Sequence, residues 1–268
     1  MDWKTWKTEY QYIVQELGLD LQSDLYCAHQ LEEILLKHAS NREKTISDKL
    51  IAILQYPIII AGAGPSLERD FELLMITKGL RKFWLISADG ATSLLKKKSL
   101  VPQVVLTDLD GDPAAIEWAM KNGSIILIHA HGDNIHLVKS FCEVYGPEFS
   151  NYFVWGTTQT YPERLWNFGG FTDGDRAICL AMHFQSPLIA LIGFDFGNQI
   201  GKYSIYNSPL QKSTSHKIRK FEVALRIISS SYSNHKGLRY NLTEKGEEIP
   251  GFTRIPVNRF WQEWDRLV

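Results

Sequence analysis

The stretch Ile58-Ile59-Ile60-Ala61-Gly62-Ala63-Gly64-Pro65-Ser66-Leu67 is an apolar run that ends in a glycine-rich loop. Five more apolar runs follow, and most of them also end in glycine or aspartate: 83–86, 104–106, 125–128, 152–155 and 188–192. Continuous apolar runs of this length are typical of strands buried on both faces of a sheet. Segments of helical character lie between most of the runs. The alternation predicts the α/β class, with a three-layer, doubly wound, mostly parallel sheet.

The chain on either side of this core has a different pattern. Residues 3–50 contain a single glycine, Gly18, and apolar residues at helical spacing, and a second helix is expected to begin at Asp24. We therefore predict a helical N-terminal segment, 1–50, and a Rossmann-like α/β domain, 51–268. A basic helix, 216–229, and an irregular tail are expected to end the second part.

Composition excludes several classes of protein. The chain has 268 residues, of which 44% are apolar and 22% charged, as in an average globular domain. Its 29 basic and 30 acidic residues give a net charge of −1, so neither nucleic acid nor an anionic membrane is expected as a partner.

The cysteines, the N-terminal residues and the least polar segment indicate where in the cell the protein is expected. Three widely spaced cysteines without a CxxC pair are read as reduced thiols rather than as a disulfide framework or a zinc site. Residues 1–10 lack the apolar core of a signal peptide. The segment 177–194 has no formal charge, but Pro187 divides it, which indicates a helix followed by a strand rather than a membrane span. A cytoplasmic location is expected.

The glycine-rich loop is the first candidate for ligand binding. Gly62 and Gly64 permit close backbone approach, Pro65 follows, and Ser66 is expected to cap a helix that begins near Leu67. The free N–H groups at such a helix start attract phosphate. The same residues also fit a plain strand-to-helix turn, because the loop matches neither the dinucleotide fingerprint nor the P-loop.

Aspartates at neighbouring strand ends are the stronger signal. Asp108 and Asp110 project to the same side of an extended chain, and Asp89 can approach from a neighbouring strand. Converging carboxylates repel one another unless a cation compensates, and hard oxygen ligands select Mg²⁺. Each aspartate taken alone also fits a helix cap or a turn. Together the three predict a magnesium site, and we expect the Asp110→Asn variant to lose turnover.

Polar residues at the later strand ends are candidates for recognising a heterocycle. His129 and His131 fit either a hydrogen bond to a ligand or packing near the site, whereas Asp133 and Asn134 offer paired donors and acceptors. Five polar residues in the following loops are assigned the same role. Two of them, Asp173 and Asp175, lie near an expected helix start, where helix capping alone explains one of the two aspartates. This set consists of Thr158, Gln159, Thr172, Asp173 and Asp175.

Aromatic and basic side chains complete the candidates. Four aromatic residues of these loops either stack on a planar ring or belong to the core: Trp155, Trp166, Phe168 and Phe171. Lys217 and Lys220 share a helix face because they are three residues apart. They fit charge stabilisation on a triphosphate, and equally a solvated basic face.

Six motifs in a fixed order carry a family resemblance. They are Gly62-Ala63-Gly64-Pro65-Ser66-Leu67, Ala88-Asp89-Gly90-Ala91, Thr107-Asp108-Leu109-Asp110-Gly111, His129-Ala130-His131-Gly132-Asp133-Asn134, Gly169-Gly170-Phe171-Thr172-Asp173-Gly174-Asp175-Arg176 and Gly193-Phe194-Asp195-Phe196-Gly197. With them the sequence resembles, over nearly its whole length, the archaeal-type 6-hydroxymethyl-7,8-dihydropterin pyrophosphokinases, relatives of the thiamin pyrophosphokinase fold.

The resemblance implies an enzyme. It implies a diphosphotransferase that uses ATP and Mg²⁺ to transfer diphosphate to a pterin hydroxymethyl group and releases AMP, in folate or methanopterin synthesis. ATP and the reduced hydroxymethylpterin are then the expected partners, with Asp195 and the glycine loop at the nucleotide, and a homodimer is possible. The alternatives are a sugar-nucleotide transferase related to flagellin-glycosylation proteins, a thiamin-type pyrophosphokinase and a non-catalytic nucleotide-binding module.

Overall fold

A single parallel sheet organises the protein. The computed structural model describes residues 3–79, 82–161, 163–197, 199–204, 206 and 214–266, without the side chains of 214–217 and 232. Within these residues, eight parallel strands form one sheet in the order β5-β4-β3-β2-β1-β6-β7-β8. The strands are β1 (Ile58–Ala61), β2 (Trp84–Ala88), β3 (Val104–Thr107), β4 (Ile125–Ala130), β5 (Phe153–Thr158), β6 (Leu188–Ile192), β7 (Leu238–Asn241) and β8 (Thr253–Arg254).

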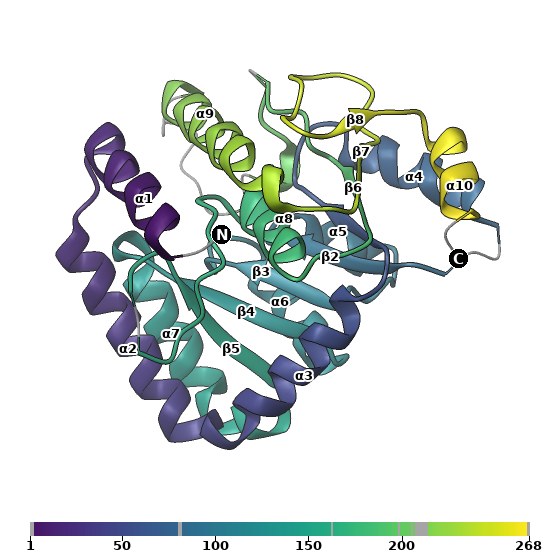
Figure 1. Cartoon of the computed structure of the whole chain (residues 1–268). Helices are drawn as coiled ribbons and strands as arrows, with labels where there is room; N and C mark the ends of the chain where they lie inside the picture. Colours follow the sequence, from purple (N-terminus) through teal and green to yellow (C-terminus); the bar gives the residue numbers. More distant parts are fainter. Residues whose placement is uncertain are drawn as a thin grey trace.

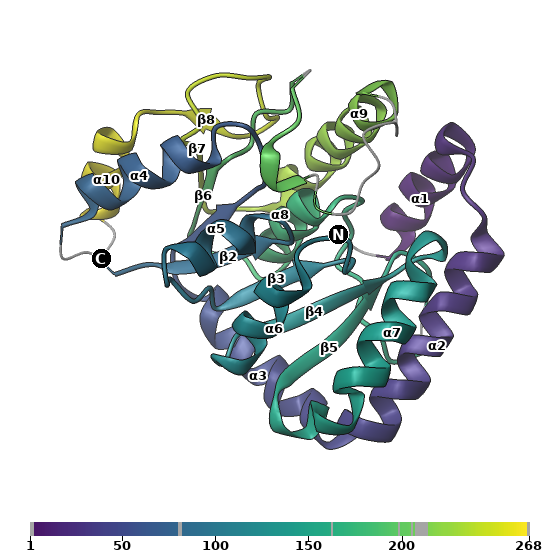
Figure 2. The same ribbon diagram turned by 180° about the vertical axis from the view of Figure 1, so that it is seen from behind.

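Helices cover both faces of the sheet, which confirms the predicted three-layer α/β fold. They are α1 (Trp3–Leu17), α2 (Leu21–Ala39), α3 (Glu43–Leu54), α4 (Leu67–Lys78), α5 (Ala91–Lys97), α6 (Pro113–Lys121), α7 (Ile135–Tyr145), α8 (Asp173–His183), α9 (Thr214–Ser231) and α10 (Val257–Trp264). Helices α3 and α8 lie on the face turned to the viewer in Figure 1, and α4, α5, α6 and α7 lie on the opposite face in Figure 2.

The central strand explains why both faces need cover. All four residues of β1 are buried. Ile58 and Ile60 belong to the core cluster that includes α3 and α8, whereas Ile59 and Ala61 belong to the cluster built with α4, α5 and α10. Alternate side chains of a strand point to opposite faces, so this apolar run is buried only when helices pack on both sides.

The strand order creates a crevice beside β1. The chain runs outward from β1 to β5 and then returns to place β6 on the other side of β1. In open α/β sheets, ligands bind outside the carboxyl ends of the strands at such a reversal. The loop after β1 and the loop after β6 meet here, because Gly62 N donates to Ile192 O and Gly64 N donates to Gly193 O, both at 2.9 Å.

The six strands expected from the apolar runs are present. The prediction of an irregular tail was wrong, because this part of the chain contains β7, β8 and α10. Strands β7 and β8 are short and not continuously apolar, so periodicity gave no signal for them. Helix α10 did carry a signal that was overlooked, because Val257, Phe260, Trp261 and Trp264 lie at helical spacing. The expected helix start at Asp24 was also wrong: α2 begins at Leu21, and Asp20 is its N-cap, accepting from Gln22 N at 3.0 Å.

The N-terminal helices pack against the rest of the molecule. Trp6, Tyr10 and Ile13 of α1 form a buried cluster with residues of α8 and α9. Figure 1 shows α1 and α9 side by side, and Glu9 of α1 pairs with Arg226 of α9 at 2.8 Å. The division at residue 50 stays a prediction.

The uncharged segment divides as expected into α8 and β6. Within the described residues, no helix is long and apolar enough to cross a membrane.

The three cysteines carry free thiols and are expected to be unreactive in the folded protein. Cys27, Cys142 and Cys179 are 0%, 5% and 1% exposed. Burial raises the pKa of each thiol to about 12, so the thiolate fraction at pH 8 is on the order of 10⁻⁴. We expect no reaction with Ellman's reagent at pH 8 over an hour, and three thiols per chain in guanidinium chloride. Rapid stoichiometric reaction of the native protein would contradict this burial.

Candidate active site

A cavity of about 490 Å³ lies over the carboxyl ends of the strands. Its floor comes from the loops after β1, β2, β3, β4 and β6, and its sides come from the α1–α2 turn, the start of α8 and one face of α9. Of the eighteen predicted site residues, seventeen have described side chains, and twelve of these line the cavity. Those that line it are Gly62, Gly64, Pro65, Asp89, Asp108, Asp110, Asp133, Gln159, Thr172, Asp173, Asp195 and Lys220; Lys217 lies on α9, but its side chain is outside the described residues.

Three carboxylates converge in this cavity. Asp89 follows β2, Asp108 follows β3 and Asp173 begins α8, and one ligand oxygen from each lies within 4.8 Å of the others. We call these residues the acidic triad. Asp173 had been assigned to heterocycle recognition, because its distance in sequence hid its approach to the other two. Asp110, the third expected metal ligand, is exposed at the rim, and its N–H donates to Asp108 Oδ1 at 3.4 Å.

The carboxylates of the triad oppose one another. Burial raises the pKa of Asp89 well above its usual value, and the charges of Asp173 and Asp108 add to the effect. Burial and Asp108 likewise raise the pKa of Asp173. For Asp108, burial is outweighed by the hydrogen bond and charge of His131, with Arg176 adding to them, and its pKa is lowered.

A divalent cation fits this donor set. The triad offers only carboxylate oxygens, which Mg²⁺ prefers. The pKa of Asp89 is raised first by burial and then by the charges of the neighbouring aspartates, so a cation bound among these carboxylates would stabilise their ionised forms. The expected magnesium site thus has suitable residues, with Asp173 beside Asp89 and Asp108.

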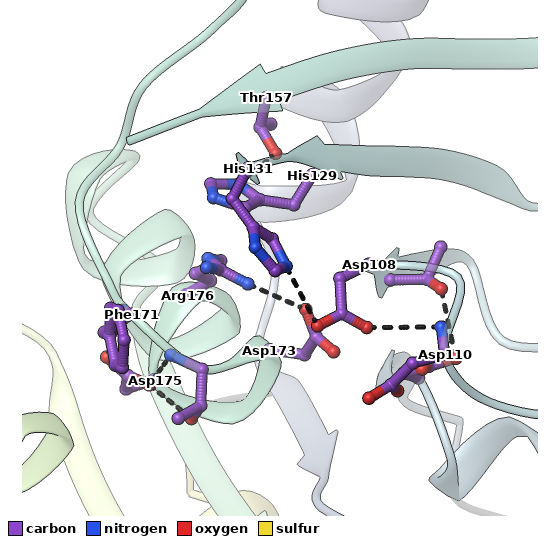
Figure 3. A network of polar contacts seen from close by, with 12 residues as sticks. Asp108, Asp110, His129, His131, Thr157, Phe171, Asp173, Asp175 and Arg176 are labelled. Carbon is purple, nitrogen blue, oxygen red and sulfur yellow. Dashed lines mark hydrogen bonds and ion pairs between the residues drawn. The ribbon is translucent and has the colours of Figure 1, made fainter. Parts of the chain in front are cut away.

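Arg176 is a site residue that sequence reasoning did not assign. Its Nη1 donates to Asp173 Oδ1 at 3.1 Å, and the two side chains are 6% and 14% exposed. On the other side of the triad, His131 Nε2 lies 3.5 Å from Asp108 Oδ2. Figure 3 shows both basic side chains pointing at the carboxylates. The Asp-x-x-Arg spacing, which puts both residues on one helix face, was the available signal.

Asp175 has a structural role that accounts for all its contacts. Its Oδ1 accepts from Thr172 N and Thr172 Oγ1, and its Oδ2 accepts from Phe171 N at 2.7 Å. The bond from Thr172 N, together with a bond from Asp175 N to the Thr172 side chain, forms the capping box of α8. Asp175 is completely buried and is absent from the cavity lining. The structure gives it no path to a substrate.

The glycine loop is a tight turn whose helix end is already occupied. The expectation that Ser66 caps α4 was wrong, because its hydroxyl makes no capping bond. Instead Ser66 N donates to Asp195 Oδ2 at 3.1 Å. A side chain at Gly64 would collide with Asp195 and with Gly193 O, which explains the glycine. Ser66 and Leu67 do not line the cavity, so this helix start offers a phosphate less than the sequence indicated.

Two expected recognition residues are used inside the protein. Asn134 is 3% exposed, and its amide donates to Asp108 O at 2.8 Å and His129 O at 2.7 Å while accepting from His131 N. Thr158 is 1% exposed and bonds Thr160. Neither lines the cavity. Asn134 therefore orients the loop that carries His131, and the packing interpretation holds for His129, which bonds Thr157.

Among the four aromatic candidates, only Phe171 lines the cavity. Trp155, Trp166 and Phe168 pack in or against the main core cluster. Lys220 reaches the cavity from α9, with its Nζ 5.8 Å from the Phe171 ring centre.

The chain is similar to proteins of one named family. A family model described as "6-hydroxymethylpterin diphosphokinase MptE-like" matches residues 28–201. A protein named 6-hydroxymethyl-7,8-dihydropterin pyrophosphokinase from Methanocaldococcus jannaschii is 37% identical over 239 residues, covering 85% of this chain and 95% of its own. Proteins of the same name from Pyrococcus furiosus and Methanothermobacter thermautotrophicus are 38% and 35% identical, covering 76% and 85% of this chain and 82% and 94% of their own.

One solved structure, the MAf glycosyltransferase from Magnetospirillum magneticum AMB-1, is far more distant. It shows 14% identity and a TM-score of 0.47, and the match covers 80% of this chain and 37% of that one. A likeness at this level has no bearing on activity.

Proposed function

The chain belongs to the 6-hydroxymethylpterin diphosphokinase MptE-like family, and we propose from this that it transfers diphosphate from ATP to 6-hydroxymethyl-7,8-dihydropterin. The hydroxymethyl oxygen attacks the β-phosphorus of ATP. A new O–P bond forms, the bond between the β-phosphorus and the oxygen bridging to the α-phosphate breaks, AMP leaves, and the alcohol gives up its proton. The acidic triad is the observation that carries the proposal, because phosphoryl transfer depends mainly on charge compensation and alignment.

The side chains divide the work. Asp89, Asp108 and Asp173 would hold Mg²⁺, with Asp110 at the rim beside them. Bound there, Mg²⁺ would supply neutralisation of phosphate charge during the transfer. Lys220, on the cavity side of α9, is proposed to contact the phosphates, and Lys217 of the same helix is proposed for the same role.

The remaining cavity residues are proposed for binding. Gly62, Gly64, Pro65 and Asp195 would bound the nucleotide, since they sit where β1 and β6 meet. Asp133, Gln159 and Thr172 would meet the pterin. Cytoplasmic location, the possible homodimer and a product used for folate or methanopterin stay predictions.

The reaction can be tested in one incubation. Purified protein is mixed with ATP, MgCl₂ and the reduced hydroxymethylpterin, and the nucleotides and pterins are separated by liquid chromatography with mass detection. We expect AMP and the pterin diphosphate in equal amounts, and neither product when EDTA replaces MgCl₂. Release of ADP with a pterin monophosphate, or turnover of a sugar nucleotide in place of ATP, would contradict the proposal.

A further inference from the structure

The turn between α1 and α2 forms one side of the cavity and has no role in the account above. Leu17, Gly18, Leu19, Asp20 and Ser23 line the cavity from this turn, with Asp24 behind them. We call these six residues the turn wall. All six lie in the segment 1–50 that the sequence pattern predicts to be a helical N-terminal segment, and all lie before residue 28, where the family match begins.

A buried hydrogen-bond network fixes the turn wall in place. Asp24 is 4% exposed. Its Oδ2 accepts from Tyr10 Oη and from Gln159 Nε2, both at 2.5 Å, and its Oδ1 accepts from Gly132 N at 2.6 Å. Trp6 Nε1 adds a bond to Gln159 O at 2.7 Å. The turn is thereby attached to the loops after β4 and β5, so it is a built surface of the site.

The charge of the turn wall disfavours phosphate. Asp20 and the neighbouring Asp133 present carboxylates on this side, and the buried carboxylate of Asp24 lies behind them. Among the described lining residues, the lysine and arginine side chains are Lys220 on α9 and Arg176 on α8, and neither belongs to the turn wall. A phosphate group and these carboxylates carry like charges, which repel one another strongly in a partly enclosed site. A neutral ring with N–H donors is instead attracted to carboxylates.

Gln159 provides a second, independent observation. Its side chain is 2% exposed and lines this part of the cavity. The bond to Asp24 fixes the amide orientation. Its Oε1 makes no hydrogen bond among the described residues, and neither does the buried Nε2 of the neighbouring His129. A buried acceptor without a donor is costly, and a ligand that brings N–H groups lowers that cost.

The order of the strands places the turn wall away from the expected nucleotide position. The reversal of strand order lies between β1 and β6, and a nucleotide is expected there. The turn wall lies with the loops after β4 and β5, beyond the acidic triad as seen from that reversal.

We propose that the turn wall binds the ring of the phosphoryl acceptor, a neutral bicyclic heterocycle rich in N–H donors, between Leu17 and Leu19 on one side and Asp133 and Gln159 on the other. This inference rests on the proposed function. It makes the α1–α2 turn, rather than the sheet edge alone, the part of the chain that selects the acceptor.

The test measures the two ligands separately, because neither reacts alone. ATP with Mg²⁺ and the reduced hydroxymethylpterin are each titrated calorimetrically into wild type, Leu19→Trp and Leu19→Ala, and thermal melting checks that each variant is folded. In Leu19→Trp the indole takes up acceptor space, so we expect the Kd of the pterin to rise about tenfold or more and the Kd of ATP to stay within about twofold. Leu19→Ala removes apolar contact and is expected to weaken pterin binding alone, by about fivefold.

The matched control is Phe196→Leu, which changes the cavity wall after β6. It is expected to weaken ATP and spare the pterin. An unchanged pterin Kd in both Leu19 variants, or an equal loss of both ligands, would overturn the inference while leaving turnover by the wild type, and so the proposed function, standing. Failure of the wild type to bind or convert the pterin would instead reject the proposed function.

Discussion

Asp108→Asn should lower kcat/KM at least about 10³-fold while the protein remains folded. Asp108 is the member of the triad that contacts both His131 and the N–H of Asp110. Asparagine keeps the size of the side chain and one acceptor oxygen, but it removes the charge that a divalent cation requires. Turnover is measured by AMP release, and Mn²⁺ binding by electron paramagnetic resonance gives a readout independent of activity.

The control for this substitution is Asp112→Asn. Asp112 caps α6 by accepting from Ala114 N at 3.0 Å, and asparagine caps a helix about as well. Turnover within about threefold of wild type is therefore expected. Asp110→Asn completes the series. The sequence pattern assigns Asp110 and Asp108 the same role as metal ligands, whereas the exposed position of Asp110 predicts a smaller loss of Mn²⁺ affinity. Near wild-type turnover and Mn²⁺ binding in Asp108→Asn would refute the metal assignment.

Arg176→Met should destabilise the fold by about 3 kcal/mol. The guanidinium is 6% exposed and bonds Asp173, and its charge also acts on Asp108. Methionine retains the apolar stem but leaves a buried carboxylate without its partner. The measurement is urea denaturation followed by circular dichroism, in EDTA and then in Mg²⁺. Since the variant site carries one more negative charge, Mg²⁺ is expected to stabilise it more than it stabilises wild type.

A double variant separates this pair from general damage to α8. Asp173→Asn combined with Arg176→Met removes both charges, so most of the lost stability should return, with a coupling energy of at least about 1 kcal/mol. Additive losses in the double variant would mean that the ion pair contributes little to stability.

The sequence was sufficient for the fold class because its apolar runs are unusually regular. Ile58–Ala61 alternates between two core clusters, and only a sheet covered on both faces buries such a run. The short strands β7 and β8 were missed for the opposite reason, since Arg239 and Arg254 interrupt them.

The site residues that could be predicted from the sequence are those that directly follow a strand. Distances between residues on different loops cannot be predicted in this way. Asp89 and Asp108 follow neighbouring strands and were found. Asp173 follows a long loop, and only the folded chain shows that it joins them. Ser66 shows the same limit, because the carboxylate that meets its N–H comes from Asp195, 129 residues away.

The bond from Trp6 to the backbone of Gln159 has a consequence for how the family is delimited. The family model matches residues 28–201, yet the bond joins the first helix of the chain to the loop after β5, and Asp24 lies outside the matched range as well. A protein cut at residue 28 would retain the triad and the sheet and lose one side of its binding chamber. The range that the family model matches and the range that encloses the whole cavity therefore have different boundaries, and differences in the α1–α2 turn are expected to accompany differences in selectivity among pterins.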